Sequence, residues 1–119
     1  MAFFDFEGKQ VYYEVHGECG EPLVILNGIM MSTNSWKPLM KNLTRNNIVI
    51  LVDFLDQGQS SRMTEAYTHE IQVRVLHALF ELLPYEKYNI MGISYGGEVA
   101  VQYAVEHPEY VRRLVLANT

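Results

Sequence analysis

The pattern Gly-x-Ser-x-Gly around Ser94 constrains the fold of this chain more than any other feature of the sequence. It follows residues 88–91, an apolar run that predicts a strand, and it leads into residues 95–106, which predict a helix. A sharp strand-to-helix turn strains the serine backbone, and Gly92 and Gly96 relieve crowding there because they lack a Cβ. Such a turn presents the serine hydroxyl beside the free N–H groups of the helix, where negative charge is favoured. The pattern therefore predicts that Ser94 is a nucleophile.

Two other interpretations of this turn are possible. A serine at a strand-to-helix junction is often only the N-cap of the helix, and this interpretation stays open on sequence grounds. Glycine-rich turns between a strand and a helix also bind dinucleotides, but they require Gly-x-Gly-x-x-Gly, whereas residues 92–97 have Gly-x-x-x-Gly-Gly. About 20 residues further on, where an acid should bind the ribose, the chain has Arg112 and Arg113. The spacing argues against a dinucleotide site.

The rest of the chain predicts strands that alternate with helices. Aromatic and β-branched residues at 4–6 and 11–15 predict an antiparallel hairpin, and unbroken apolar runs at 23–26 and 48–52 are typical of buried parallel strands. Further segments predict helices at 35–43 and 68–83 and a last strand at 111–116. This order predicts an α/β fold with a mostly parallel sheet, an N-terminal antiparallel hairpin and helices on both faces.

The two helices that precede the serine turn also predict which side chains are buried. In the first helix, one side is apolar and is expected in the core; it consists of Trp36, Leu39, Met40 and Leu43. In the second helix, apolar and polar residues alternate with a helical period. On this pattern, His69 and His77 are expected to be solvated surface histidines.

Composition excludes several classes of function. With 119 residues and 49% hydrophobic residues, the chain can form one domain with a buried core. A net charge of -5 without a basic patch argues against nucleic acid and against an anionic membrane surface as partners. No apolar run approaches the ~20 residues of a membrane helix, and the single cysteine, Cys19, indicates a reducing cytoplasm. No spacing typical of metal ligands occurs, so neither a metal nor another cofactor is expected.

Taken in order, these motifs resemble the N-terminal portion of an α/β-hydrolase fold protein over nearly the whole chain. Residues 26–29 resemble the His-Gly turn after the third strand of that family, and residues 53–60 resemble its Asp-x-x-Gly-x-Gly-x-Ser loop after the fourth. The turn at Ser94 resembles its nucleophile elbow after the fifth strand. The resemblance implies that residues 1–119 form the N-terminal part of a single hydrolase domain, which lacks the lid, the last strands and the final helices.

The resemblance also assigns roles to residues of the expected site. It implies that Ser94 is the catalytic nucleophile and that the backbone N–H groups of Ile29 and Tyr95 form the oxyanion hole. Gly28 would let the backbone of that hole approach closely. The sequence departs from the family pattern at the rim of the site: Asn27 and Gln57 occupy positions where histidine is usual, and Asp56 occupies a position where glycine is usual.

The larger departure from the family pattern is the absence of the catalytic partners of the serine. In this fold both the triad acid and the triad histidine follow the serine in the chain. The candidates after Ser94 are Glu98, Glu106, His107 and Glu109. His107 lies about 13 positions along the helix, roughly 20 Å away at the rise of a helix, and cannot reach the serine. Glu98 is expected to favour the helix dipole instead. His16, on the hairpin, has no geometric reason to approach Ser94.

The resemblance therefore implies a serine-dependent hydrolase or acyl-transfer enzyme that acts on a small ester, thioester or related acyl substrate. The acid and the histidine would come from sequence outside this chain. The alternative is a non-catalytic role on the same fold, either as a ligand-binding module or as a truncated fragment that is inactive alone. An acid and a histidine beyond Thr119 would separate the two interpretations.

The predicted last strand also leads to an expectation about association. In the strand order 1-2-4-3-5-6-7-8 that the resemblance implies, a chain ending after residues 111–116 leaves an open edge with unpaired N–H and C=O groups. Ile90 and either Leu114 or Val115 are expected to meet water, and each exposed large apolar side chain forgoes roughly 1.5–3 kcal/mol of burial. We therefore expect pairing with a complementary chain segment or with a second copy.

Overall fold

The computed structural model describes residues 2–118, and a mixed six-stranded sheet forms its centre. The strands are β1 (Ala2–Phe6), β2 (Lys9–His16), β3 (Glu21–Leu26), β4 (Asn47–Asp53), β5 (Tyr88–Ile93) and β6 (Val111–Ala117). Their order across the sheet is β1-β2-β4-β3-β5-β6. The hairpin β1–β2 and the pair β2–β4 are antiparallel, and the remaining pairs are parallel. The predicted fold class is confirmed.

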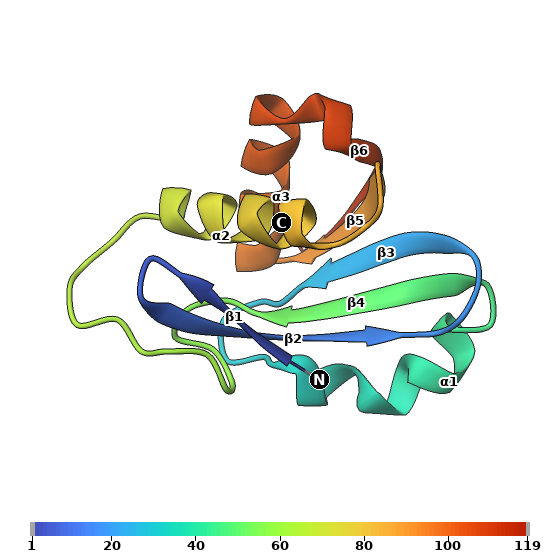
Figure 1. Ribbon diagram of the computed structural model, residues 1–119, viewed down its shortest axis with the longest axis horizontal. Coiled ribbons are helices and arrows are strands. Elements are labelled where there is room, and N and C mark those ends of the chain that lie inside the picture. The colour runs from blue at the N-terminus through green and yellow to red at the C-terminus, as the bar shows by residue number, and fades with distance from the viewer. Residues whose placement is uncertain (1, 119) are drawn as a thin grey trace.

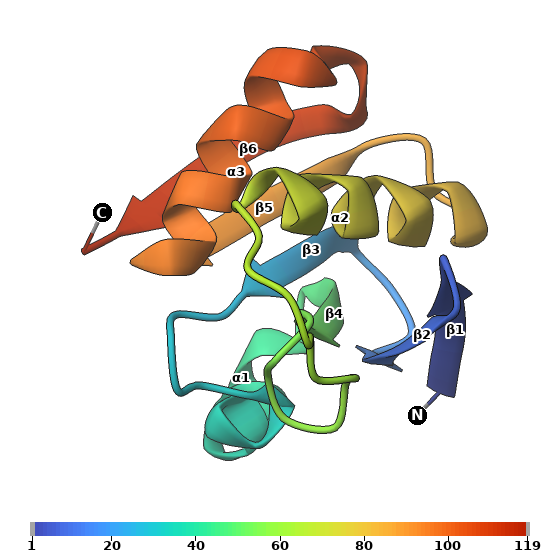
Figure 2. The ribbon, with the colours of Figure 1, turned by 90° about the vertical axis from the view of Figure 1, so that its left-hand side faces the viewer.

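Helices cover both faces of the sheet, which makes three layers (Figures 1 and 2). One face is covered by α2 (Glu70–Leu82) and α3 (Tyr95–Glu106), and the other by the 3-10 helix η1 (Thr33–Leu39) and the short α1 (Met40–Leu43). A second 3-10 turn, η2 (Pro108–Tyr110), leads into β6. Within residues 2–118, no helix combines the length and the apolar character needed to cross a membrane.

The alternation of side chains along each inner strand divides the core into two clusters. On β3, Val24 and Leu26 point toward α2 and α3, whereas Ile25 points toward η1. On β4, Ile50 belongs to the first cluster and Leu51 to the second. This is the period of two that a pleated strand imposes, and it explains why both strands are apolar without interruption.

The segment predicted as one helix over residues 35–43 is a 3-10 helix followed by a single α-helical turn. Pro38 lies inside it and has no N–H to donate to the preceding turn, which disfavours a regular α-helix. Of the four side chains expected in the core, only Trp36 is buried; Leu39 is 46% exposed, and Met40 and Leu43 are half-buried. The expectation was wrong for Leu39 because the 3-10 turn rotates it away from the sheet.

The prediction that His69 and His77 are solvated surface histidines is wrong, and both are half-buried. The His77 ring stacks on the His107 ring with centroids 4.1 Å apart, and its Nδ1 lies 3.1 Å from the Tyr103 hydroxyl. The Nε2 of His69 is hydrogen-bonded to Gln102 on α3. Each histidine therefore helps to join α2 to the end or the side of α3, a long-range contact that helical periodicity does not show.

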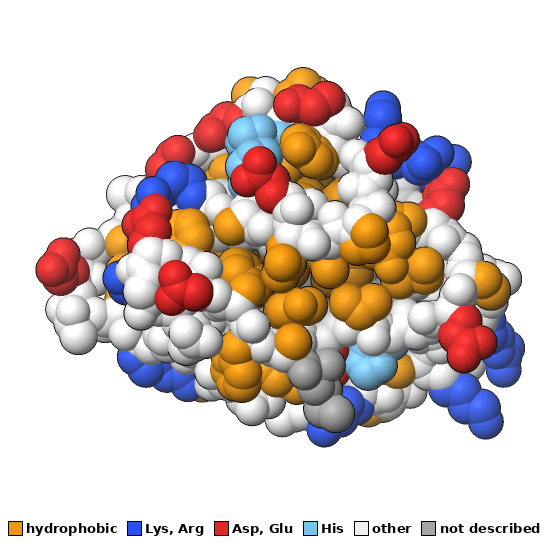
Figure 3. All heavy atoms as spheres, in the orientation of Figure 1, with side chains coloured by type: hydrophobic (Ala, Val, Ile, Leu, Met, Phe, Trp, Pro, Cys, Tyr) orange, Lys and Arg blue, Asp and Glu red, His pale blue; other side chains and the backbone are white. Residues whose placement is uncertain are grey.

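Apolar surface is exposed at both edges of the sheet. On β6, Leu114 is 36% and Val115 is 53% exposed, as expected, but Ile90 is fully buried because it points toward α2 and α3. The β1–β2 hairpin faces the viewer in Figure 3, where hydrophobic side chains gather in the middle of the surface and charged ones surround them. Phe3 and Val15 are the large exposed hydrophobic residues of this hairpin.

Candidate active site

Ser94 joins β5 to α3 through a strained turn. Its backbone has φ 51° and ψ -111°, in the region that glycine adopts far more readily than other residues. A Cβ on Gly92 would lie 2.6 Å from the carbonyl oxygen of Gly96, and a Cβ on Gly96 would overlap the carbonyl of Leu26. Only glycine fits at either position, so the two glycines make this turn possible.

The side chain of Ser94 is exposed and does not cap the helix. The residue occupies the N-cap position of α3, but its side chain makes no capping hydrogen bond. Its carbonyl instead accepts from the N–H groups of Gly97 and Glu98, and its own N–H donates to the carbonyl of Ala117 at 3.0 Å. The interpretation of Ser94 as a simple N-cap is therefore wrong. Within the part of the chain that the structure describes, its hydroxyl has no hydrogen-bond partner and is free to meet a ligand.

Two backbone turns meet beside this hydroxyl. Tyr95 is the first residue of α3, so its N–H has no partner within the helix. Opposite it, Gly28 to Met31 form a turn closed by a 3.2 Å hydrogen bond from the Met31 N–H to the Gly28 carbonyl. Ile29 is the second residue of that turn, and its N–H takes no part in the closing bond. Both N–H groups are thus available near Ser94.

Close packing brings the two turns together. A Cβ on Gly28 would lie 3.3 Å from the carbonyl oxygen of Ile93, which is a tight contact, and 3.6 Å from the Cβ of Ser94, which is an ordinary one, so the two turns are in direct contact. A hollow of about 160 Å³ lies here, and it is lined by Ile29, Ser94, Tyr95, Glu98 and Asn118. The structure therefore brings together Ser94 and the two residues whose N–H groups the sequence singled out.

A network of buried amides supports the turn that contains Ile29. The Trp36 Nε1–H donates to Oδ1 of Asn27 at 2.7 Å, and the Asn27 amide donates to Oε1 of Gln57 at 3.2 Å. The Gln57 amide in turn donates to the carbonyl of Gly28 at 3.3 Å. Asn27 and Gln57, two of the positions that depart from the family pattern, are therefore bonded to each other and hold the Gly28 turn in place.

The carboxylate of Asp53 anchors the loop after β4. It is fully buried and accepts hydrogen bonds from the N–H groups of Thr33 at 2.8 Å and Gln59 at 3.0 Å. Gly58 has φ 44° and packs directly on this carboxylate, where a Cβ would overlap it. These bonds tie the loop to the start of η1, so the carboxylate is engaged in holding the backbone.

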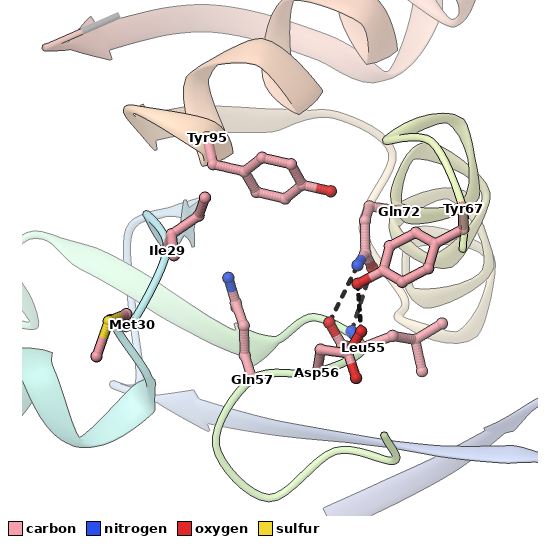
Figure 4. A pocket seen from close by; sticks show the side chains of 8 residues that line it. All are labelled: Ile29, Met30, Leu55, Asp56, Gln57, Tyr67, Gln72 and Tyr95. Atoms are coloured by element: carbon pink, nitrogen blue, oxygen red, sulfur yellow. Dashed lines mark hydrogen bonds between the residues drawn. The ribbon is translucent and has the colours of Figure 1, made fainter. Parts of the chain in front are cut away.

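A larger cavity of about 240 Å³ adjoins the two turns (Figure 4). It is lined by Ile29, Met30, Leu55, Asp56, Gln57, Tyr67, Gln72 and Tyr95. In Figure 4, Tyr95 and Ile29 lie on one side of it, and Asp56, Leu55 and Tyr67 lie on the other. The cavity therefore begins at the two residues that flank Ser94 and ends at the loop after β4.

Gln72, Tyr67 and Asp56 form the side of this cavity that lies opposite Ile29 and Tyr95. Gln72 is 1% exposed and makes two hydrogen bonds to the backbone of Leu55, at 3.1 and 3.2 Å. Tyr67 donates its hydroxyl to Asp56, and burial together with that carboxylate raises the pKa of Tyr67 to about 12. Burial also raises the pKa of Tyr95 above its ordinary value. The tyrosine hydroxyls are neutral donors at physiological pH.

Sequence patterns did not predict Tyr67 or Gln72 as residues of the candidate site. The only available signal for Gln72 was a polar side chain on the buried side of α2, where the neighbouring helical positions are apolar. Tyr67 lies in an irregular segment, and its position depends on the path of the loop. Neither residue stands out in a motif.

No histidine of the described chain lines either hollow beside Ser94. The Nε2 of His16 lies 2.7 Å from Glu14 on β2, His69 contacts Gln102, and His77 stacks on His107. Glu98 does line the hollow, but it lies in the first turn of α3, as expected for an acid that favours the helix dipole. The described residues thus offer a hydroxyl and two backbone amides, without a neighbouring histidine.

Known proteins match the sequence of this chain over most of its length. The family described as alpha/beta hydrolase fold matches residues 21–119. A proline iminopeptidase of Lactobacillus helveticus is 35% identical over 122 aligned residues, which cover 96% of this chain and 42% of that protein. A 2-hydroxymuconate semialdehyde hydrolase of a Pseudomonas species is 34% identical over 104 residues, which cover 84% of this chain and 37% of that protein.

Solved structures agree with the sequence matches. An alpha/beta hydrolase enzyme from a Medee basin deep-sea metagenome library superposes with a TM-score of 0.95 and 43% identity, over 99% of this chain and 44% of that one. A hydrolase of Pseudomonas aeruginosa gives a TM-score of 0.94 with 28% identity, over 99% and 45%. The chain spans less than half the length of each of these relatives. It belongs to the alpha/beta hydrolase fold family.

Proposed function

We propose that this chain supplies the nucleophile of a serine-dependent hydrolase or acyl-transfer enzyme that acts on a small ester, thioester or related acyl substrate. The observation that supports this most strongly is the backbone of Ser94, which is held at φ 51° between β5 and α3 with its hydroxyl exposed. Strain of this kind is retained where a function requires it. The hydrolases among the relatives support the same reaction class.

In the proposed mechanism, Oγ of Ser94 attacks the acyl carbonyl carbon and forms a tetrahedral intermediate. The N–H groups of Ile29 and Tyr95 form the oxyanion hole that stabilises its negative oxygen. A histidine, oriented by an acid, takes the serine proton and delivers it to the leaving group, and an acyl-enzyme remains. Water or another acceptor then releases the acyl group. In this proposal, the acid and the histidine would come from sequence outside these 119 residues.

The proposal also includes the location of the enzyme, the support of the Ile29 amide and the cavity that receives the substrate. We expect a cytoplasmic enzyme, and the single, exposed and unpaired Cys19 is consistent with that. The amide network around Asn27 would keep the Ile29 amide in place during the reaction. The cavity that begins at Ile29 and Tyr95 would receive part of the substrate.

Labelling by a fluorophosphonate probe tests the nucleophile, because such probes react with activated serines. In a protein that contains the complete domain, we expect Ser94→Ala to abolish labelling and to reduce ester hydrolysis by at least about 10³-fold. Ser35→Ala, which removes another exposed serine hydroxyl, should leave both unchanged. Undiminished labelling of Ser94→Ala would refute the assignment.

A non-catalytic, ligand-binding role on the same fold is the second candidate. The absence of a histidine from the hollows beside Ser94, within residues 2–118, favours it. This role predicts that the wild-type protein binds small acyl ligands without reacting with the probe. Turnover of an aryl ester by the 119-residue chain alone would contradict the inactive fragment and would show that a residue of this chain serves as the base.

A further inference from the structure

Asp56 holds a strained backbone conformation beside the larger cavity. Its φ is 71°, in the left-handed region. The sequence pattern that this loop resembles has glycine at this position, and glycine would adopt the conformation without strain. Aspartate and asparagine tolerate it better than most other residues, but still at a cost. The loop therefore has a carboxylate at a position where glycine would be less strained.

The structure fixes the direction of this carboxylate and leaves part of it free. Oδ1 accepts from the N–H of Met63 at 2.7 Å, and Oδ2 accepts from the hydroxyl of Tyr67. A carboxylate has about four acceptor sites, so roughly two remain. The Tyr67 hydroxyl is protonated at neutral pH, and partial burial together with the Asp56 carboxylate raises its pKa further, to about 12.

The negative charge of Asp56 has no basic partner among residues 2–118. The salt bridges of the described chain all involve other acids. Arg62 follows in the same loop, but its guanidinium donates to the carbonyl oxygens of Gly58 and Ser60. An oriented carboxylate that lines a cavity without a cation of its own can attract one from a ligand.

The surroundings of the carboxylate suit an organic cation better than a metal ion. The rings of Tyr67 and Tyr95 line the same cavity, and aromatic faces attract ammonium groups. Leu55 and Ile29 add apolar surface, and the buried amide of Gln72 is occupied by the backbone of Leu55. A metal ion would need several more oxygen ligands than Asp56 offers.

We propose that Asp56 makes this site selective for substrates that carry a positively charged amine on the part that enters the cavity. The proposal rests on the proposed function, since Ile29 and Tyr95 connect the cavity to Ser94. The substrate class is then an acyl compound with an ammonium group at its far end, seated between the two tyrosines and Asp56.

Two esters of the same shape isolate the effect of charge. The aryl ester of 4-(trimethylammonio)butanoic acid is cationic, and that of 5,5-dimethylhexanoic acid is its neutral isostere. With a protein that contains the complete domain, at low salt, we expect kcat/KM to favour the cationic ester about fivefold. The preference should fall as salt screens the charge. Equal kcat/KM values for the two esters would overturn the proposal.

Matched variants assign the preference to Asp56. Asp56→Asn keeps the size of the side chain and the tolerance for positive φ but removes the charge, so we expect the ratio of kcat/KM for the cationic ester to that for the neutral ester to fall to about one. Glu65→Gln removes the same charge from an exposed position in the same loop and should retain the full preference. A preference that survives in Asp56→Asn would also overturn the proposal.

A binding experiment separates this proposal from the assignment of Ser94. Choline and its neutral isostere 3,3-dimethylbutan-1-ol are titrated into the Ser94→Ala protein, where no chemistry occurs. Tighter binding of choline that is lost in Asp56→Asn supports the cation site even if the probe shows that Ser94 is not the nucleophile. Equal binding of the two compounds refutes the cation site even if Ser94 is the nucleophile.

Discussion

The two faces of the sheet are held by different kinds of interaction. Under α2 and α3, large aromatic side chains are packed without exposure, and the rings of Phe80 and Tyr88 stack with centroids 3.7 Å apart. The opposite face buries a small cluster around Ile25 and Trp36. There the covering element is a 3-10 helix, and its tryptophan is fixed by a hydrogen bond to Asn27. The face under α2 and α3 is therefore held by apolar packing. The face under η1 is also held by the hydrogen bond between Trp36 and Asn27.

This difference explains how the candidate site is built. Ser94 and Tyr95 begin the helix that covers the apolar core, whereas Ile29 lies in the turn that the amide network of Asn27 and Gln57 supports. The site therefore lies where the two kinds of packing meet. Damage to the apolar face should unfold the chain, whereas damage to the polar network should loosen one side of the site first.

The largest expected effect comes from truncating the apolar face. Leu79 on α2 is fully buried, and we expect Leu79→Ala to lower the free energy of unfolding by about 3 kcal/mol through lost burial and a cavity. Leu116 on β6 is 42% exposed, so Leu116→Ala should cost about 1 kcal/mol or less. Urea unfolding of both variants measures the contrast. Leu116 lies on the same face of the sheet as Leu79, so equal losses would show that the edge strand is packed as tightly as the interior of this face.

A smaller effect should follow from breaking the polar network. Asn27→Ala leaves the buried Nε1–H of Trp36 without its acceptor, and we expect a loss of about 1–3 kcal/mol in the free energy of unfolding. The chain has one tryptophan, so its fluorescence reports on this face alone and should shift to the red as η1 loosens.

The control for this prediction is a double-mutant cycle with Trp36→Phe, which removes the donor. The double variant should lose less stability than the sum of the single ones, because the two side chains share one hydrogen bond. Additive losses, with unchanged fluorescence in Asn27→Ala, would contradict the idea that this bond holds η1 on the sheet.

Local patterns in the sequence predicted most of the fold. Apolar runs at β3 and β4 and the helical period of α2 appear within single segments, because burial imposes them residue by residue. The errors concern contacts between segments. The 3-10 geometry around Pro38 exposes Leu39, and the stacking of His77 on His107 depends on how α2 meets the end of α3.

The candidate site was predictable to the extent that it depends on backbone turns. Steric limits require glycine at positions 92 and 96 around Ser94, and this spacing can be recognised in the sequence. The bond between Asn27 and Gln57 and the pairing of Asp56 with Tyr67 depend on the path of a long irregular loop. No local rule fixes that path, so these side chains could be noted singly but not as partners.

The smallest expected change in stability concerns β6, at the edge of the face that η1 and α1 cover. Val115 on β6 is 53% exposed and shares this face with Met91 and Ile93, which are half-buried. We propose that this edge pairs with a complementary chain segment or, when the chain is alone, with a second copy. Lysine on an edge strand opposes such pairing, so Val115→Lys should reduce self-association while it changes the free energy of unfolding by less than about 0.5 kcal/mol.

Sedimentation velocity at micromolar concentration measures this association. Wild type should form dimers or larger species, and Val115→Lys should shift the distribution toward monomer. Val105→Lys is the matched control, since Val105 is 75% exposed and lies on α3 and not on the edge strand, and it should associate as wild type does. A wild-type chain that stays monomeric and unfolds cooperatively would show that the exposed edge needs no partner. Both faces of the sheet would then be stable in the isolated chain, despite their different packing.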